Sequence, residues 1–225
     1  MEHWESFWKN EKFKPIVLGQ PPAILYGGTN QEPLASIGMS CFLDAVREDF
    51  KPGFSVIDYG CGAGILSNFI SARLQDFKYV GLEPDSQHGW GRIALGERYF
   101  KDPRVSFGTI EEDFNEKIKN KVDAIVLISV FTHLALMDVY TILDRLIEVF
   151  ERNPKCSIVF SCFVAEKSEA LNHQPHIWER FYGEAYLSLA DLRAYTDAYG
   201  LKLEKHMDFT AMGGFVHSIF KLTRP

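Results

Sequence analysis

The 225-residue sequence lacks several features that would each point to a particular class of protein. Its first twenty residues mix acids, lysines and aromatic residues, so they lack the continuous apolar run of a signal peptide or a membrane span. It has no basic tract and a net charge of -6, which disfavours tight binding to nucleic acid. Its four cysteines form no CxxC pair. We therefore expect a soluble, cytoplasmic protein with reduced thiols and no metal, nucleic-acid partner or membrane association.

The chain is long enough for one sizeable core, because 46% of its residues are hydrophobic, and we expect a single domain over 1–225. Apolar runs predict strands at 54–59, 78–84, 104–108, 122–129 and 156–163. Amphipathic patterns predict helices at 34–49, 63–75, 86–100, 136–152 and 188–199. This alternation of strands and helices is typical of a parallel sheet.

The end of the chain differs from its middle. The expected strands 201–209 and 215–222 are joined by a link of a few residues, which is too short for a parallel crossover and so predicts an antiparallel pair. The predicted fold is therefore α/β and doubly wound, with a mostly parallel seven-stranded sheet, an antiparallel C-terminal strand and helices on both faces.

Three glycines follow the first expected strand in VIDYGCGAG (56–64). Ligands of open α/β sheets bind at the carboxyl ends of strands, and a glycine loop lets a ligand approach the backbone closely. A dinucleotide fingerprint would need its third glycine at position 65, which is Ile65, and Asp58 is poorly placed for a nearby pyrophosphate. The loop therefore favours a ligand with an ammonium group. A nicotinamide-dependent oxidoreductase stays open as an alternative, as does a domain that binds a donor without catalysis.

VIDYGCGAG resembles the D-x-G-x-G-x-G motif of the class I S-adenosylmethionine-dependent methyltransferases. The resemblance implies that S-adenosylmethionine is the cofactor and S-adenosylhomocysteine the product. It implies that Asp58 helps to hold the donor's amino group while the loop residues Gly60, Cys61, Gly62 and Gly64 lie against its methionine moiety.

Later segments carry the same resemblance over about residues 35–163. YVGLEPD (79–85) places Glu83 where the family has the acid that accepts both ribose hydroxyls, with Pro84 beside it. RVSFGTIEEDF resembles the adenine-side loop of the family, and VDAIVLISVFTHL its fourth strand. The remaining expected donor contacts are Thr109, Ile110, Ser129 and Tyr26.

The acceptor side lies outside the resemblance. We expect a small-molecule acceptor methylated at O, N or C, and the sequence leaves the oligomeric state open. His133, just past the fourth strand, is the candidate general base, although the same residue could instead cap or pack the next helix. Residues 1–33 are expected to form an N-terminal helix and lid, and 164–187 a substrate-side insertion. Their candidate acceptor contacts are Trp8, His173, His176, Trp178, Phe181, Tyr182 and Tyr186, which could equally pin these segments onto the core. The two histidines lack a third metal ligand at a telling spacing.

Overall fold

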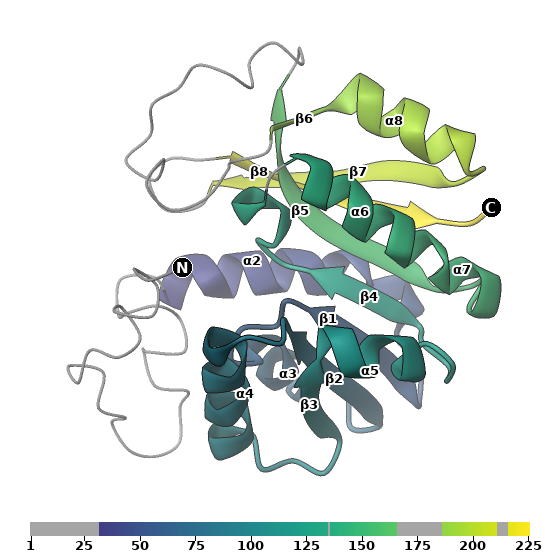
Figure 1. Ribbon diagram of the computed structural model, residues 1–225. Coiled ribbons are helices and arrows are strands. Elements are labelled where there is room, and N and C mark those ends of the chain that lie inside the picture. The colour runs from purple at the N-terminus through teal and green to yellow at the C-terminus, as the bar shows by residue number, and fades with distance from the viewer. Residues whose placement is uncertain (1–31, 135, 166–185, 211–215) are drawn as a thin grey trace.

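The computed structural model describes residues 32–134, 136–165, 186–210 and 216–225 (Figure 1). Its strands are β1 (Phe54–Tyr59), β2 (Phe77–Glu83), β3 (Val105–Thr109), β4 (Ala124–Leu127), β5 (Ser157–Ala165), β6 (Tyr186–Ser188), β7 (Lys202–Thr210) and β8 (Val216–Thr223). Seven of them lie in the order β3-β2-β1-β4-β5-β8-β7, and β6 pairs with the end of β5. β8 runs antiparallel to both of its neighbours, while β1 to β5 are parallel. The predicted mostly parallel sheet with one reversed C-terminal strand is confirmed.

Helices cover both faces of this sheet. They are α2 (Glu32–Ala45), α3 (Ile65–Ser71), α4 (Gln87–Tyr99), α5 (Ile110–Lys117), α6 (Leu136–Ile147), α7 (Val149–Arg152) and α8 (Leu189–Ala198), with short 3-10 turns at Arg47–Asp49 and Phe131–His133. The central strand β4 is apolar and buried along its whole length, and β5 is buried at all but one position, as is typical of parallel strands with both faces covered. Figure 1 shows α5, α6 and α7 in front of the sheet and α2 behind it.

Each face of the sheet has its own apolar core. On one face Phe114 of α5 and Leu143 of α6 pack in the same cluster as Ile125 of β4. On the other face Phe42 of α2 and Leu66 of α3 share a cluster that includes other residues of β1, β2 and β4. The two cores clamp the parallel strands between helices, which holds the strand ends in a fixed arrangement.

Three details differ from the expectation. The helix α5, directly after β3, was not predicted, and neither was the short strand β6. The expected helix 136–152 is divided at Glu148 into α6 and α7. The expected start of α8 is confirmed, because the hydroxyl oxygen of Ser188 accepts the Asp191 N–H at 3.4 Å.

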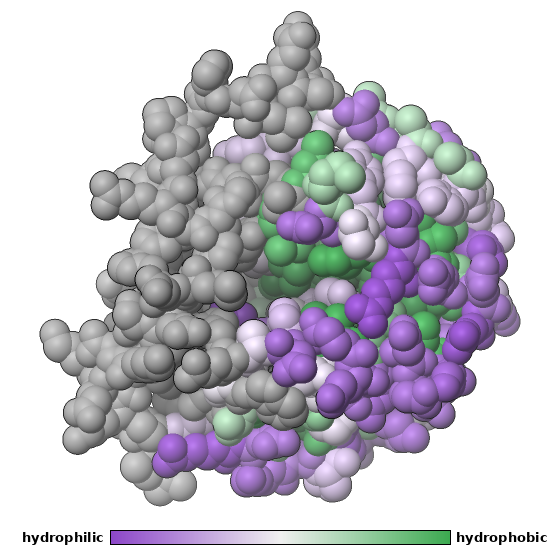
Figure 2. Space-filling model, viewed as in Figure 1, coloured by the Kyte–Doolittle hydropathy of each residue, from purple (hydrophilic) through white to green (hydrophobic). Residues whose placement is uncertain are grey.

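The described surface was compared with the requirements of a membrane span. On the face shown in Figure 2, hydrophilic side chains cover most of the described surface. Within the described ranges, no helix combines the length and the apolarity needed to cross a bilayer.

Candidate functional site

The carboxyl ends of β1 to β4 bring most of the expected donor contacts to one edge of the sheet. Asp58 is the next-to-last residue of β1, two residues before the loop 60–64, while Glu83 ends β2 and Thr109 ends β3. Ser129 follows β4. Because these four strands are parallel and adjacent, residues far apart in the chain lie side by side here. The topology therefore places these expected donor contacts at one edge of the sheet.

The three loop glycines differ in their surroundings. All have left-handed backbone torsions, with φ of +74° at Gly60, +58° at Gly62 and +76° at Gly64. A Cβ on Gly60 would lie 2.7 Å from Val130, and one on Gly64 would lie 2.5 Å from the Phe107 ring. At Gly62, by contrast, no atom of the described residues lies within 4 Å of that position. Two glycines thus let the loop pack closely, and the middle one leaves open space over the backbone.

The carboxylate of Glu83 contacts the loop at Gly62. Its side chain is almost completely buried, with 1% of the residue exposed, and Oε1 accepts the backbone N–H of Gly62. Arg92 of α4 places Nη1 3.2 Å from Oε2. Burial raises the pKa of the Glu83 carboxyl, and the Arg92 charge and the Gly62 N–H oppose that rise. The carboxylate that sequence spacing selected is therefore oriented and charge-compensated.

Asp58 lies deeper, with 3% of its surface exposed. The Tyr79 hydroxyl donates a hydrogen bond to Asp58 Oδ2 at 2.6 Å. Burial raises the pKa of Asp58 to about 7, the hydrogen bond from Tyr79 opposes this rise, and the negative charge of Glu83 adds to it. Asp58 therefore changes its charge close to neutral pH.

Cys61, in the same loop, is a thiol rather than a thiolate. Burial, with the nearby Glu83 and Asp58 charges, raises its pKa well above the ordinary range. Its sulfur lies over Gly81 of β2, where a Cβ would be only 2.8 Å away. The thiol also donates to the Gly62 carbonyl oxygen at 3.3 Å, so Cys61 packs as a small neutral side chain between the loop and β2.

The ends of β3 and β4 are shaped by backbone contacts. Thr109 is fully buried and caps α5, its hydroxyl accepting the Glu112 N–H at 3.4 Å. Ser129 has the unusual φ of +56°, and its N–H donates to Ser161 Oγ at 2.9 Å. Strained torsions of this kind persist where the surroundings over-determine them, and they gather at functional sites. Ile110 begins α5 and is buried, while Pro84 is exposed beside Glu83.

Several residues of this edge were missed by sequence reasoning. Tyr79 and Arg92 contact the two acids from neighbouring elements, and no local pattern signals such pairs. Glu111 accepts the Asp85 N–H at 2.7 Å and so connects the loop after β2 to α5. A usable signal did exist for α5, since Thr109 and Glu112 have the spacing of a capping box.

The acceptor-side predictions are mostly beyond the described residues. His133 ends the 3-10 turn after β4, which places its backbone near Ser129. Tyr186 begins β6, and its ring stacks on Phe163 at 5.2 Å between centroids. The other acceptor candidates, together with the expected donor contact Tyr26, lie outside the described residues: Trp8, His173, His176, Trp178, Phe181 and Tyr182.

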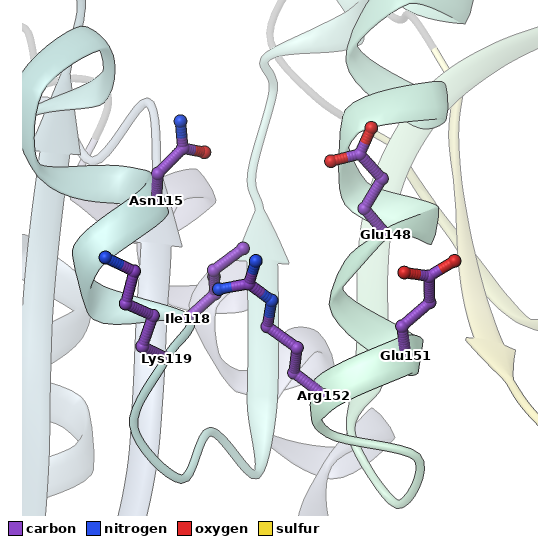
Figure 3. A pocket seen from close by; sticks show the side chains of 6 residues that line it. All are labelled: Asn115, Ile118, Lys119, Glu148, Glu151 and Arg152. Atoms are coloured by element: carbon purple, nitrogen blue, oxygen red, sulfur yellow. The ribbon is translucent and has the colours of Figure 1, made fainter.

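A separate cavity lies at the opposite edge of the sheet, between the end of α5 and α7 (Figure 3). It has a volume of about 200 Å³ and is lined by Asn115, Ile118, Lys119, Glu148, Glu151 and Arg152. These residues precede β4 and β5, whereas the glycine loop follows β1. In the part of the chain that the structure describes, no group of three or more His, Cys, Asp or Glu residues is arranged to hold a metal ion.

The match to a known family decides between the possible cofactor classes. A family model described as a methyltransferase domain matches residues 31–206. The chain belongs to this methyltransferase family. The match includes β1 to β5 and every described residue of the candidate donor site, so the resemblance seen in VIDYGCGAG is confirmed.

One curated relative and many solved structures resemble the methyltransferase. The ribosomal protein L11 methyltransferase of Caldicellulosiruptor saccharolyticus is 32% identical over 129 residues, which cover 55% of this chain and 40% of the relative. The methyltransferase thus spans about two fifths of the length of that relative.

Among solved structures, the magnesium protoporphyrin IX methyltransferase of Synechocystis with bound SAM has a TM-score of 0.59 and 15% identity, covering 99% of this chain and 91% of that one. Human N-acetylserotonin methyltransferase in complex with SAM has a TM-score of 0.59 and 13% identity, covering 85% of this chain and 53% of that one. At these identities the likeness establishes the shared fold.

Proposed function

We propose that this chain binds S-adenosylmethionine at the carboxyl edge of β1 to β4 and transfers its methyl group to a small-molecule acceptor at O, N or C. The observation that carries the proposal is the loop 60–64, in which Gly62 faces open space while its N–H holds the buried Glu83 carboxylate. A glycine loop and a buried acid on adjacent strands provide both a close backbone approach and an anchor for a sugar. Relatives of the same fold are described with bound SAM or SAH.

The two acids fit the two polar ends of such a donor. Glu83 offers two carboxylate oxygens, which match the two hydroxyls of a ribose. Asp58, when ionised, offers a negative charge to the ammonium group of the methionine moiety. Gly60, Cys61 and Gly64 shape the loop between them, and Pro84, Thr109, Ile110 and Ser129 complete the edge. Tyr26 is proposed to cover the donor from the N-terminal segment.

In the proposed methyl transfer, the main contribution of the protein is to position the donor and the acceptor. The sulfonium donor supplies a methyl group whose bond to sulfur breaks as the bond to the acceptor atom forms, leaving a neutral thioether. The chain's residues hold the two reactants in line and exclude water. A base is needed only where the acceptor must lose a proton, and we propose His133 for that role.

Aromatic side chains near the carboxyl end of β5 support a small acceptor. Phe163 stacks on Tyr186 and lies edge-on to His217 at 4.9 Å, at the same side of the sheet as the donor edge. Aromatic linings are typical of sites for apolar or planar ligands. We propose that residues 1–33 and 164–187 cover this side, with acceptor contacts from Trp8, His173, His176, Trp178, Phe181, Tyr182 and Tyr186.

We further propose that the enzyme works in the cytoplasm, without a nucleic-acid partner. All four cysteines lie in the described part of the chain and are free, which agrees with a reducing compartment. The net charge of -6 would repel a phosphate backbone.

Binding and transfer experiments test the proposal in two steps. S-adenosylhomocysteine at about 100 times its Kd should stabilise the fold by about 2.7 kcal/mol in a thermal-shift titration, whereas NAD should not shift the melting temperature. Labelled S-adenosylmethionine is then incubated with the enzyme and either a metabolite extract or ribosomal proteins. Label should appear in a small molecule, and His133→Ala should lose that transfer while it keeps S-adenosylhomocysteine binding. A shift with NAD alone would contradict the cofactor, and label in protein alone would contradict the acceptor class.

A further inference from the structure

We infer that Arg92 is a positioning residue of the donor site, whose guanidinium holds the Glu83 carboxylate in place to accept the two ribose hydroxyls. This inference rests on the proposed function, because it assigns a role within the same site. Arg92 lies nine residues after Glu83, on the second turn of α4, outside the motifs that the sequence singled out.

The contact is made by a single nitrogen. Nη1 of Arg92 lies 3.2 Å from Oε2 and 3.4 Å from Oε1 of Glu83, while the Gly62 N–H donates to Oε1 from the other side. The Glu83 side chain is only 2% exposed, and that of Arg92 is 27% exposed. A buried carboxylate without a partner is costly, so this contact keeps the charge inside the fold.

The carboxylate keeps acceptor positions for a diol. An ionised carboxylate has about four lone-pair positions on its two oxygens. Gly62 takes one position on Oε1, and the main Arg92 contact takes one on Oε2. The second Arg92 contact, from Nη1 to Oε1, is longer at 3.4 Å. When a hydroxyl replaces that longer contact, one position on each oxygen serves the two neighbouring hydroxyl donors. Arg92 and Gly62 together thus fix the plane of the carboxylate and still leave its outer positions for a sugar.

The helix that carries Arg92 is anchored to the segment after Glu83. Ser86 caps α4 by accepting the Gly89 N–H at 3.0 Å. A Cβ on Gly89 would collide with the backbone oxygen of Pro84, so only glycine lets the helix start lie this close to the strand end. The distance between Arg92 and Glu83 is therefore set by local backbone contacts and does not depend on a flexible loop.

The other titratable groups around Glu83 would not replace Arg92. Asp58, Cys61 and Tyr79 all feel the Glu83 charge, and each of them is neutral or negative. Burial raises the pKa of Glu83, and the first influence that lowers it is Arg92. Without Arg92, the carboxyl would hold its proton to a higher pH and would then donate to the sugar where it has to accept.

The test uses 5′-methylthioadenosine, which has the adenine and ribose of the donor and no amino group for Asp58. Its Kd is measured by titration calorimetry at pH 6.5 and 8.5. For Arg92→Met we expect binding to be weakened about tenfold or more at pH 6.5 and partly restored at pH 8.5. Arg92→Lys, which keeps the charge, should recover most of the affinity at pH 6.5.

Matched variants keep the result interpretable. Arg98→Met removes an arginine of the same helix that lies over the Tyr99 ring, and it should bind like the wild type at both pH values. Arg92→Gln replaces Arg92→Met if the latter does not fold. Equal weakening of Arg92→Met at both pH values, or no weakening, would overturn the inference while the proposed function stands. A wild type that binds neither 5′-methylthioadenosine nor S-adenosylhomocysteine would remove both.

Discussion

At the scale of single residues, Asp58 gives the site a pH dependence. Its pKa is raised to about 7 by burial, against the hydrogen bond from Tyr79 and with the added charge of Glu83. An ionised Asp58 attracts the donor's ammonium group, and a protonated one does not. The affinity for S-adenosylhomocysteine should therefore rise with pH, by about tenfold between pH 6 and pH 8. Calorimetric titration across that range measures it.

Tyr79→Phe is the matched variant for this prediction. It removes the hydroxyl that donates to Asp58 at 2.6 Å and leaves the ring contact with Phe107 in place. Since that hydrogen bond lowers the pKa of Asp58, its loss should move the midpoint of the pH profile upward. An unchanged midpoint in Tyr79→Phe would show that another group sets the profile.

Single residues also show which parts of the candidate site can be predicted from the spacing of sequence motifs. Asp58, Glu83 and the three loop glycines are predicted as donor contacts because a strand, a tight turn and the next strand have characteristic lengths. The partners Tyr79 and Arg92 were not found, because their contacts depend on which side chains face each other across neighbouring elements. The chemistry of the acids, their charge state above all, is set by those partners.

At the scale of elements, the Phe107 ring explains why three separate elements carry a glycine. A Cβ on Gly64, on Gly81 of β2 or on Gly96 of α4 would lie 2.5 to 2.9 Å from this ring. The ring thus fits between the glycine loop, β2 and α4, and it sets how closely they approach. This contact joins the loop to the helix that carries Arg92.

Replacing two glycines of α4 by alanine should change the stability of the fold in opposite directions. Gly91→Ala should stabilise the fold by about 0.5–1 kcal/mol, because alanine favours helix and no described atom lies within 4 Å of the new methyl group. Gly96→Ala should instead destabilise it by about 1–3 kcal/mol, because the methyl group meets the Phe107 ring at 2.6 Å. Urea denaturation measures both. Adding Phe107→Leu to Gly96→Ala should recover part of the loss, and no recovery would mean that the ring is not the obstacle.

Element prediction failed where the local signal was short. α5 has eight residues, of which only Ile110 and Phe114 are buried, so its periodicity covers about two turns. Its three acids follow the Thr109 cap, where their negative charges interact favourably with the positive end of the helix dipole. A run of acids is equally typical of any solvated surface, so it does not by itself predict a helix. β6 has three residues and is defined only by its pairing with β5, a contact between segments about twenty residues apart. The formation of α5 and β6 depends on tertiary packing, which a local sequence pattern does not reveal.

At the scale of the whole molecule, the two edges of the sheet have different roles. The edge formed by the carboxyl ends of the strands holds the buried acids of the candidate site. At the opposite edge, formed by the amino ends, Asp123 connects neighbouring strands. This side chain accepts the Ser55 N–H at 2.9 Å and pairs with Lys51 at 2.8 Å and Lys121 at 3.2 Å. It therefore connects the start of β4 to the start of β1, far from the glycine loop.

Asp123→Asn should lower the stability of the fold without changing the affinity for S-adenosylhomocysteine. Burial alone would raise the pKa of Asp123, but Lys51, the Ser55 N–H and Lys121 lower it. A carboxyl with a lowered pKa stabilises the fold above its unfolded pKa, and that contribution is lost as the pH falls through the folded value. We expect Asp123→Asn to cost about 1–3 kcal/mol of unfolding free energy at pH 7 and less near pH 3. The exposed Glu97→Gln serves as the control. The Kd for S-adenosylhomocysteine should stay unchanged in both variants, and weaker binding in Asp123→Asn at unchanged stability would contradict this division between the edges.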